Sequence, residues 1–278
     1  MNTAYPQLLD WMRAEGPRLL VALSGGVDSS LLAAAATDAL GSGVLCVTAR
    51  SALHPQEEQE QASSLAKQLG CAHRFIDAGE FEQDAVRANG PERCYHCKRH
   101  IGQALITLAL KENLGQVIEG SNADDDPDRR PGARAVSELG LRSPLAELGM
   151  GKAQVRALAK ARGLPNWNRP ASACLATRIP SGEALEESRL KRIEQAEAAM
   201  RSLFLGREGA MRVRDHGRLA RLELEPAEFE MLCADPLLRG CVYEALIEIG
   251  YAQACLDLNG FRSGSMDVAQ KKQENEDG

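Results

Sequence analysis

The stretch Arg18-Leu-Leu-Val-Ala-Leu-Ser-Gly-Gly-Val-Asp-Ser-Ser30 decides the fold of this 278-residue chain. It begins as a short apolar run, reaches a Gly-Gly pair, and leads into an alanine-rich segment that continues to Leu40. A short apolar run that ends at glycine favours a strand, whereas a longer alanine-rich segment favours a helix. The stretch therefore predicts a strand, a tight turn and a helix, in that order.

The turn in this stretch has the composition of a phosphate site. Such a site needs backbone N–H groups aimed at anionic oxygens, small residues that allow close approach, and the N-terminus of a helix. Asp28 would repel phosphate, so we expect it to hold a Mg²⁺ ion that bridges the phosphates. A polar turn without a ligand is the alternative. The expected phosphate-side residues are Ser24, Gly25, Gly26, Asp28, Ser29 and Ser30.

The chain around this turn alternates between strand-like and helix-like segments. After the first strand and helix, strands are expected at 44–48, 73–77 and 116–120, and helices at 55–69, 95–113 and 152–162. Such alternation is typical of a parallel α/β sheet, in which ligands bind beyond the carboxyl ends of the strands. The glycine turn and the polar loop 121–132, which follows the strand at 116–120, would both lie at that edge. Asn122, Asp125 and Asp128 are candidate ligand residues in the loop.

Length and composition suggest two domains. We expect residues 1–182 to form the phosphate-binding domain, 183–265 a smaller α/β domain for substrate binding and oligomerisation, and 266–278 a disordered tail. The smaller domain is expected to contain helices at 186–205, 226–233 and 236–249, a hairpin of strands at 210–214 and 219–223, and a final strand at 252–258.

Charge and hydropathy exclude several classes of protein. No apolar run approaches the ~20 residues that span a bilayer, and the N-terminal segment reads as an amphipathic helix instead of a signal peptide. We therefore expect a cytoplasmic protein without membrane contact. The net charge of -6 gives no overall attraction for nucleic acid.

Three of the eight cysteines occur in patterns that suggest chemistry. Cys94 and Cys97 form a C-x-x-C that is a redox pair or half of a metal site. Cys174 lies between Arg169 and Arg178, whose charge would favour its thiolate, so it is a candidate nucleophile or ligand; a structural cysteine is the alternative. The remaining thiols are interpreted as reduced packing residues: Cys46, Cys71, Cys233, Cys241 and Cys255.

A pair of arginines in the second domain suggests an anion site. Strand alternation places Arg212 and Arg214 on one face, where two guanidinium groups suit a phosphate or a carboxylate. A solvated basic face is the alternative.

These motifs together resemble a known family. Ser24 to Ser30 resembles the SGGxDS signature of the PP-loop ATP pyrophosphatases, which transfer AMP to an acceptor and release pyrophosphate. With ERCYHCK at 92–98, the loop at 120–132, RPASACLATRIP at 169–180 and MRVRDHG at 211–217, nearly the whole chain resembles the LarE family. These are ATP-dependent sulfur transferases that mature the nickel-pincer nucleotide cofactor of lactate racemase. The resemblance implies a Rossmann-like PP-loop domain, a smaller C-terminal α/β domain and hexamers.

The resemblance also implies a substrate and a sulfur source. The substrate would be a pyridinium dicarboxylate mononucleotide, activated as an acyl adenylate and converted to a thiocarboxylate, with Arg212 and Arg214 on its phosphate. Members with three cysteines hold a [4Fe–4S] cluster, here on Cys94, Cys97 and Cys174, whose open iron would carry sulfide. We favour this source over sacrifice of the Cys174 sulfur.

Two other adenylating enzymes remain as alternatives. A tRNA-thiolating PP-loop enzyme can also use three cysteines, but the acidic net charge and the short basic segment argue against an RNA substrate. An ammonia-using ligase of the NAD-synthetase type would need no cysteine at all.

Overall fold

The computed structural model describes residues 3–126, 130–170, 173–204, 209–262 and 264–266. The chain divides into two compact units, residues 1–86 with 92–172 and residues 87–91 with 173–278. The boundary at 172–173 lies ten residues before the one expected from composition, because the Pro- and Ser-rich segment up to Gly182 belongs to the second unit. The expected tail lies, except for Met266, outside the described residues.

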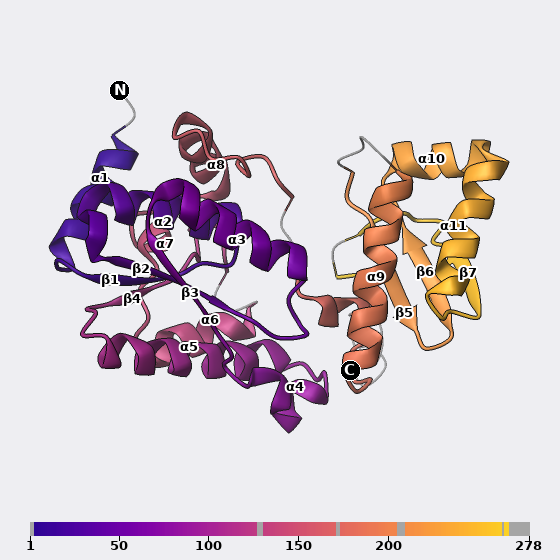
Figure 1. The fold of residues 1–278 in the computed structure, drawn as a ribbon, viewed down its shortest axis with the longest axis horizontal. Helices are drawn as coiled ribbons and strands as arrows, with labels where there is room; N and C mark the ends of the chain where they lie inside the picture. The colour runs from indigo at the N-terminus through magenta and orange to yellow at the C-terminus, as the bar shows by residue number, and fades with distance from the viewer. Residues whose placement is uncertain (1–2, 127–129, 171–172, 205–208, 263, 267–278) are drawn as a thin grey trace, which may run out of the picture. The chain divides into compact units, whose positions relative to one another are not determined.

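A parallel four-stranded sheet forms the centre of the first unit (Figure 1). Its strands are β1 (Leu19–Ala22), β2 (Val44–Ala49), β3 (Ala72–Ile76) and β4 (Val117–Ile118), in the order β3-β2-β1-β4. Val21 of β1 pairs with Cys46 of β2, and Cys46 pairs in turn with His73 of β3. This sheet confirms the α/β fold class expected from the alternating pattern.

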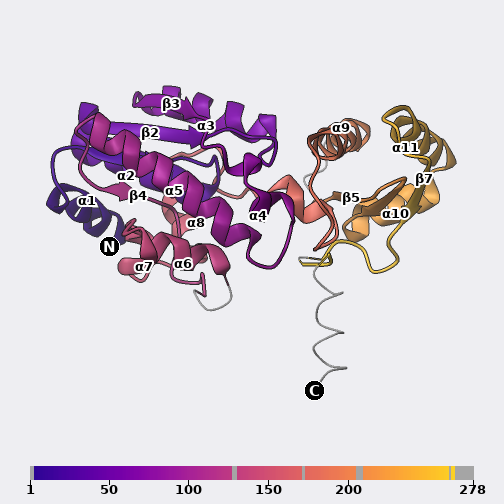
Figure 2. The same ribbon diagram turned by 90° about the horizontal axis from the view of Figure 1, so that it is seen from below.

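Helices cover both faces of this sheet (Figures 1 and 2). One face packs on α1 (Ala4–Ala14), α2 (Val27–Leu40), α3 (Gln56–Leu69) and α8 (Lys152–Ala161), and the other packs on α5 (Arg93–Lys111). Successive residues of β1 pack on opposite faces of the sheet: Val21 belongs to the core on the α2 side and Leu20 to the core on the α5 side. Because both faces are buried, the strands read as continuous apolar runs.

Several short elements were not expected from the sequence. They are η1 (Gly41–Gly43), η2 (Glu80–Glu82), α4 (Asp84–Arg87), α6 (Pro131–Glu138) and α7 (Pro144–Glu147). The expected strand at 116–120 is correspondingly reduced to the two residues of β4. Tertiary packing explains α6: a Cβ added at Gly102 of α5 would lie 2.6 Å from Leu139 Cδ1, so the segment that ends α6 packs directly on α5.

The second unit is a three-stranded sheet packed on helices. Strands β5 (Arg212–His216) and β6 (Leu219–Glu223) form the expected hairpin, and β7 (Gln253–Leu256) pairs with β6 in parallel. Its helices are η3 (Leu175–Arg178), α9 (Glu187–Leu203), α10 (Pro226–Ala234) and α11 (Pro236–Glu248). Residues 87–91 join it through the Leu185 N–H, which donates to the Arg87 carbonyl at 2.7 Å.

Within the described residues, none of the helices combines the length and the apolar character that crossing a membrane requires.

Candidate functional site

The glycine turn brings its backbone unusually close to α3. Gly25 has φ +82, which residues with a side chain rarely adopt, and a Cβ added there would lie 2.9 Å from the Glu58 carbonyl oxygen. Gly26 is the N-cap of α2 with φ -73, and a Cβ there would meet only the Ser24 hydroxyl at 3.5 Å. The two glycines therefore differ: Gly25 is required by the fold, while Gly26 leaves space above the helix N-terminus.

The serines of the turn fix its shape. The Ser24 N–H donates to Ser29 Oγ at 3.2 Å, and the hydroxyls of Ser29 and Ser30 donate to the Gly26 carbonyl at 3.0 and 2.8 Å. The first N–H groups of an α-helix have no acceptor within the helix, so those at the start of α2 can receive an anion. The turn is therefore a candidate anion site.

Asp28 is the charged centre of this site. Lys152, the first residue of α8, forms an ion pair with one Asp28 oxygen, and Asn122 donates to the other at 3.2 Å. The Lys152 backbone N–H donates to Asp124 at 2.6 Å, which holds α8 against the loop after β4. Lys152 was not expected at this site, because nothing in its local sequence indicates that α8 begins beside Asp28.

The Asp28 carboxylate is a suitable ligand for a magnesium ion at a phosphate site. Mg²⁺ prefers carboxylate and phosphate oxygens and retains several waters, so one protein carboxylate at a phosphate site is sufficient. Asp28 is the carboxylate at that position, with its side chain 17% exposed. Lys152 supplies the balancing charge in this structure, so magnesium and lysine would share the neutralisation of Asp28 and the phosphates.

Asn166 ties the segment after α8 to the turn. Its side-chain amide donates to the Gly25 carbonyl at 2.8 Å and to Ser30 Oγ at 2.9 Å. Its Oδ1 is buried without a hydrogen-bond partner among the described residues, so it can accept a bond from a ligand. The sequence placed Asn166 near a cysteine motif and offered no reason to expect it at the phosphates.

The loop after β4 contributes partly as expected. Asn122 bonds Asp28, whereas Asp125 accepts from the Asn122 N–H at 3.1 Å and pairs with Arg130 at 2.6 Å. Asp125 therefore shapes the loop, and Asp128 lies outside the described residues.

A second polar cluster lies where β2, β3 and β4 end. Glu80 is fully buried, neither of its carboxylate oxygens accepts a hydrogen bond from the described residues, and His54 Nδ1 lies 3.8 Å away. Burial lowers the pKa of His54. The negative charge of Glu80 raises it, and the positive charge of Lys98 lowers it, so the pKa is below its usual value. Lys98 also pairs with the buried Glu119 at 3.3 Å. The cluster was not expected from the sequence, because its members come from four separate segments of the chain.

The three candidate sulfur-chemistry cysteines are divided between the units. Cys94 and Cys97 lie in the first two turns of α5, the former exposed and the latter half-buried, and Cys174 precedes η3 in the second unit. Within the described residues, no three His, Cys, Asp or Glu side chains are grouped to hold a metal ion.

The arginines expected to flank Cys174 have other partners. Arg178 is 1% exposed, makes a two-point ion pair with Glu197 at 2.9 and 3.0 Å, and donates to the Cys174 carbonyl at 3.2 Å. Arg169 pairs with Glu57 in the first unit at 3.0 Å. Both guanidinium groups therefore take part in ion pairs, and Arg178 also orders the backbone at Cys174, while the effect of their charges on the Cys174 thiolate stays a prediction.

The paired arginines of β5 occupy different environments. Arg214 is 4% exposed; it pairs with the buried Glu223 at 2.5 Å and donates to the Thr177 carbonyl at 3.0 Å, which links β5 to the Cys174 segment. Arg212 is half-buried, with its guanidinium 5.2 Å from the Phe261 ring centre. Arg214 thus supports the strand, and Arg212 is the member more accessible to a ligand.

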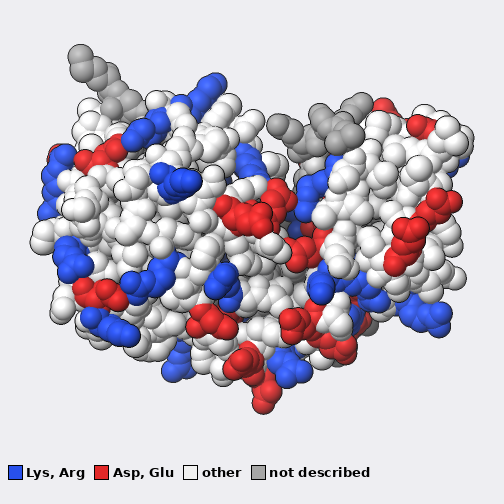
Figure 3. All heavy atoms as spheres, in the orientation of Figure 1, with Lys and Arg blue, Asp and Glu red and all other residues white. Residues whose placement is uncertain are grey.

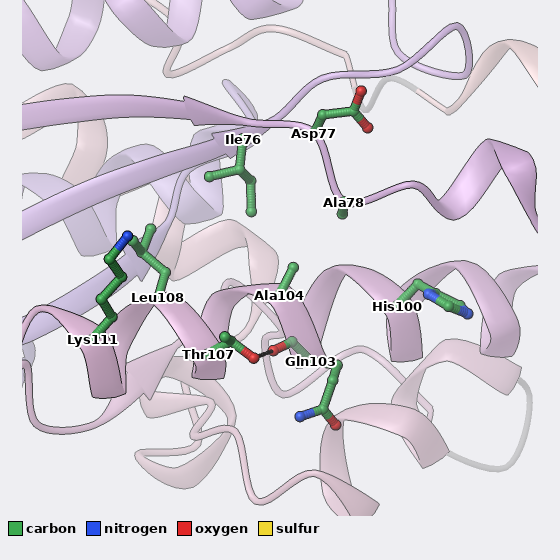
Figure 4. Close-up of a pocket in the computed structure, with 9 residues that line it drawn as sticks. All are labelled: Ile76, Asp77, Ala78, His100, Gln103, Ala104, Thr107, Leu108 and Lys111. Atoms are coloured by element: carbon green, nitrogen blue, oxygen red, sulfur yellow. Dashed lines mark hydrogen bonds between the residues drawn. The ribbon is translucent and has the colours of Figure 1, made fainter.

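A separate groove of about 430 Å³ lies between the end of β3 and α5 (Figure 4). Ile76, Asp77 and Ala78 line it from the strand side, and His100 and Lys111 lie on the helix side. None of the residues expected to act on ATP or sulfur lines this groove.

Some known proteins resemble only part of this chain, and others resemble nearly all of it. A family model described as asparagine synthase matches residues 12–108, which include the glycine turn. A glutamine-hydrolysing GMP synthase of Pyrobaculum aerophilum is 31% identical over 55% of this chain and 33% of its own length. These similarities cover the chain only in part.

Other relatives match nearly the whole chain, and two of them are more than 35% identical to it. The pyridinium-3,5-bisthiocarboxylic acid mononucleotide synthase of Lactiplantibacillus plantarum is 36% identical over 90% of this chain and 88% of its own length. An uncharacterised protein of Synechocystis is 39% identical over 90% of this chain and 91% of its own length.

The difference between the two glycines predicts unequal effects of alanine. Gly25→Ala should lower the free energy of unfolding by about 2 kcal/mol, because the new Cβ meets the Glu58 carbonyl in a disfavoured backbone conformation. Gly26→Ala should cost less than half as much. Urea titrations of both variants measure the difference, and equal losses would contradict the strain at Gly25.

The unpartnered Glu80 carboxylate predicts a stabilising substitution. Glu80→Gln should raise the free energy of unfolding at pH 7 by about 1 kcal/mol, because it removes a buried charge that accepts no hydrogen bond from the described residues. The exposed neighbour Glu82 provides the control, since Glu82→Gln should leave stability unchanged. A loss of stability in Glu80→Gln would show that the His54 contact outweighs the burial cost.

Proposed function

Because the chain belongs to the LarE family of ATP-using, sulfur-transferring enzymes, we propose that it converts a carboxylate of a pyridinium dicarboxylate mononucleotide to a thiocarboxylate. The observation that carries this proposal is the similarity along nine-tenths of the chain to a synthase of the pyridinium bisthiocarboxylic acid mononucleotide. The product would serve in the synthesis of a nickel-pincer nucleotide cofactor, such as that of lactate racemase.

The first step is adenylation of the substrate carboxylate. A carboxylate oxygen attacks the α-phosphorus of ATP, and pyrophosphate leaves. The start of α2 and the Gly25–Gly26 turn would bind the departing pyrophosphate, with Ser24, Ser29 and Ser30 holding the turn in shape. Asp28 would hold the Mg²⁺ that neutralises the phosphates, and Lys152 would add a second positive charge.

The second step delivers sulfur to the acyl adenylate. A sulfur nucleophile attacks the activated carbonyl carbon, and AMP leaves. We propose Cys94, Cys97 and Cys174 as ligands of a [4Fe–4S] cluster that supplies sulfide when bound, with loss of the Cys174 sulfur itself as the alternative source. The hydrogen bond from Arg178 to the Cys174 carbonyl supports an ordered position for this cysteine in either case.

We propose that the second unit binds the substrate phosphate. The residues we propose for it are Arg214, which the buried Glu223 holds in place, and Arg212, whose guanidinium lies over the Phe261 ring. Arg212 is the member best placed to contact the phosphate directly.

We also propose that the chain forms homo-oligomers, which are expected to be hexamers.

Thiolation of an RNA substrate is the less favoured function. On the face drawn in Figure 3, Lys and Arg side chains are interspersed with Asp and Glu over the described part of each unit. An RNA backbone requires a continuous basic track, and the net charge of -6 supplies no general attraction.

The proposed phosphate site predicts a specific binding defect. Arg212→Ala should raise KM for the mononucleotide about tenfold or more, while KM for ATP stays the same, because only the substrate phosphate loses its partner. Arg218 is an exposed arginine on the same hairpin, so Arg218→Ala is the matched control. Steady-state pyrophosphate release measures both constants, and equal effects of the two variants would contradict the assignment.

The two sulfur sources predict different iron contents and different protein masses after turnover. Protein purified without oxygen should contain iron and acid-labile sulfide, and its mass after removal of the cluster should be the same before and after turnover. Absence of iron, together with loss of one H₂S equivalent from the Cys174 peptide after turnover, would overturn the cluster and establish sacrifice of Cys174. Iron analysis and intact mass spectrometry distinguish the two.

A further inference from the structure

Two cysteines outside the proposed active site lie in contact. Cys46 Sγ on β2 and Cys71 Sγ, just before β3, are 3.3 Å apart. The parallel pairing of Leu45 with Ala72 and Cys46 with His73 brings these thiols together from positions 25 residues apart. The sequence suggested two independent packing residues, whereas the sheet makes them a pair.

The two thiols differ in exposure and polarity. Cys46 is 0% exposed, while Cys71 is half-buried and can donate its S–H to the Ala66 carbonyl at 3.5 Å. The hydrogen bond from Cys46 lowers the pKa of Cys71 to about 7, and the same bond, together with burial, raises the pKa of Cys46. The partly exposed thiol is thus the more readily ionised one, which is the arrangement of an attacking thiol with a resolving partner.

We propose that Cys46 and Cys71 form a reversible disulfide, in which Cys71 reacts with low-molecular-weight disulfides and Cys46 resolves the product. This site is separate from Cys94, Cys97 and Cys174, and it does not depend on the function proposed above.

The reaction balances as two thiol–disulfide exchanges. The Cys71 thiolate attacks one sulfur of the external disulfide, a mixed disulfide forms at Cys71, and one thiolate leaves. Cys46 then attacks Cys71 Sγ, its proton passes to the second leaving thiolate, and the Cys46–Cys71 bond forms. The two protein thiols lose two electrons, and the external disulfide gains them as two thiols.

Little movement is needed to close the bond. The sulfurs must approach from 3.3 Å to about 2.05 Å, a change within reach of side-chain rotation and small backbone shifts. The bond would join β2 to the segment that follows α3, and the first turn of α3 contacts the Gly25 turn. The bond would use no residue placed in the candidate phosphate site.

The test uses the full-length, reduced protein and oxidised glutathione. After exposure at pH 7.5, remaining thiols are alkylated and the protein is digested without reduction. The expected result is a linked peptide pair containing Cys46 and Cys71 that dithiothreitol separates, and a rise in the midpoint of thermal unfolding of roughly 5 °C or more. Recovery of both cysteines as alkylated thiols would overturn the proposal.

Single variants separate the two roles. Cys46→Ser should leave a stable glutathione adduct on Cys71, because the resolving thiol is gone, whereas Cys71→Ser should leave Cys46 unmodified. Cys233→Ser removes an exposed thiol of the second unit and should leave the linked peptide unchanged. Adducts on Cys46 in Cys71→Ser, or no adduct on Cys71 in Cys46→Ser, would contradict the assigned order.

Discussion

The close approach of the Gly25 backbone to α3 is the constraint on which the phosphate end of the first unit depends. A Cβ at Gly25 would lie 2.9 Å from the Glu58 carbonyl, so the turn can take this path only with glycine. The turn in turn directs the start of α2 toward the edge where the parallel strands end, and Asn166 fastens it by bonding the Gly25 carbonyl and Ser30. A helix N-terminus placed at such an edge is suited to bind phosphate.

Ion pairs hold the helices that lie around the turn. Lys152 neutralises Asp28 from α8, and Lys98 pairs with Glu119 from α5, so two helices on opposite faces of the sheet are anchored at one edge. The second unit also contains ion pairs, and these are buried. Arg178 pairs with Glu197, and Arg214 pairs with Glu223. Removing one member of such a pair would strand a buried charge, which gives these residues structural as well as functional importance.

The eight cysteines illustrate how much environment matters. All five thiols without a motif were interpreted as packing residues, yet Cys233, Cys241 and Cys255 are exposed, so for them the interpretation was wrong. Short helices and an edge strand of a small sheet leave one side open to solvent, and local hydropathy does not reveal which side. Cys46 is buried as expected, but it also contacts the Cys71 thiol, which its local sequence did not indicate.

The sequence by itself determined the parallel α/β fold, the hairpin of the second unit and the turn at Ser24 to Ser30 that leads into the helix after the first strand. These depend on local properties: apolar periodicity, glycine at a tight turn and the start of a helix. Only the tertiary structure decided that Lys152 meets Asp28, that Glu80 is buried beside His54, and that Arg214 faces Glu223 while Arg212 remains accessible. Those contacts depend on which strands and helices become neighbours, and residues far apart in the chain carry no local signal of their partner.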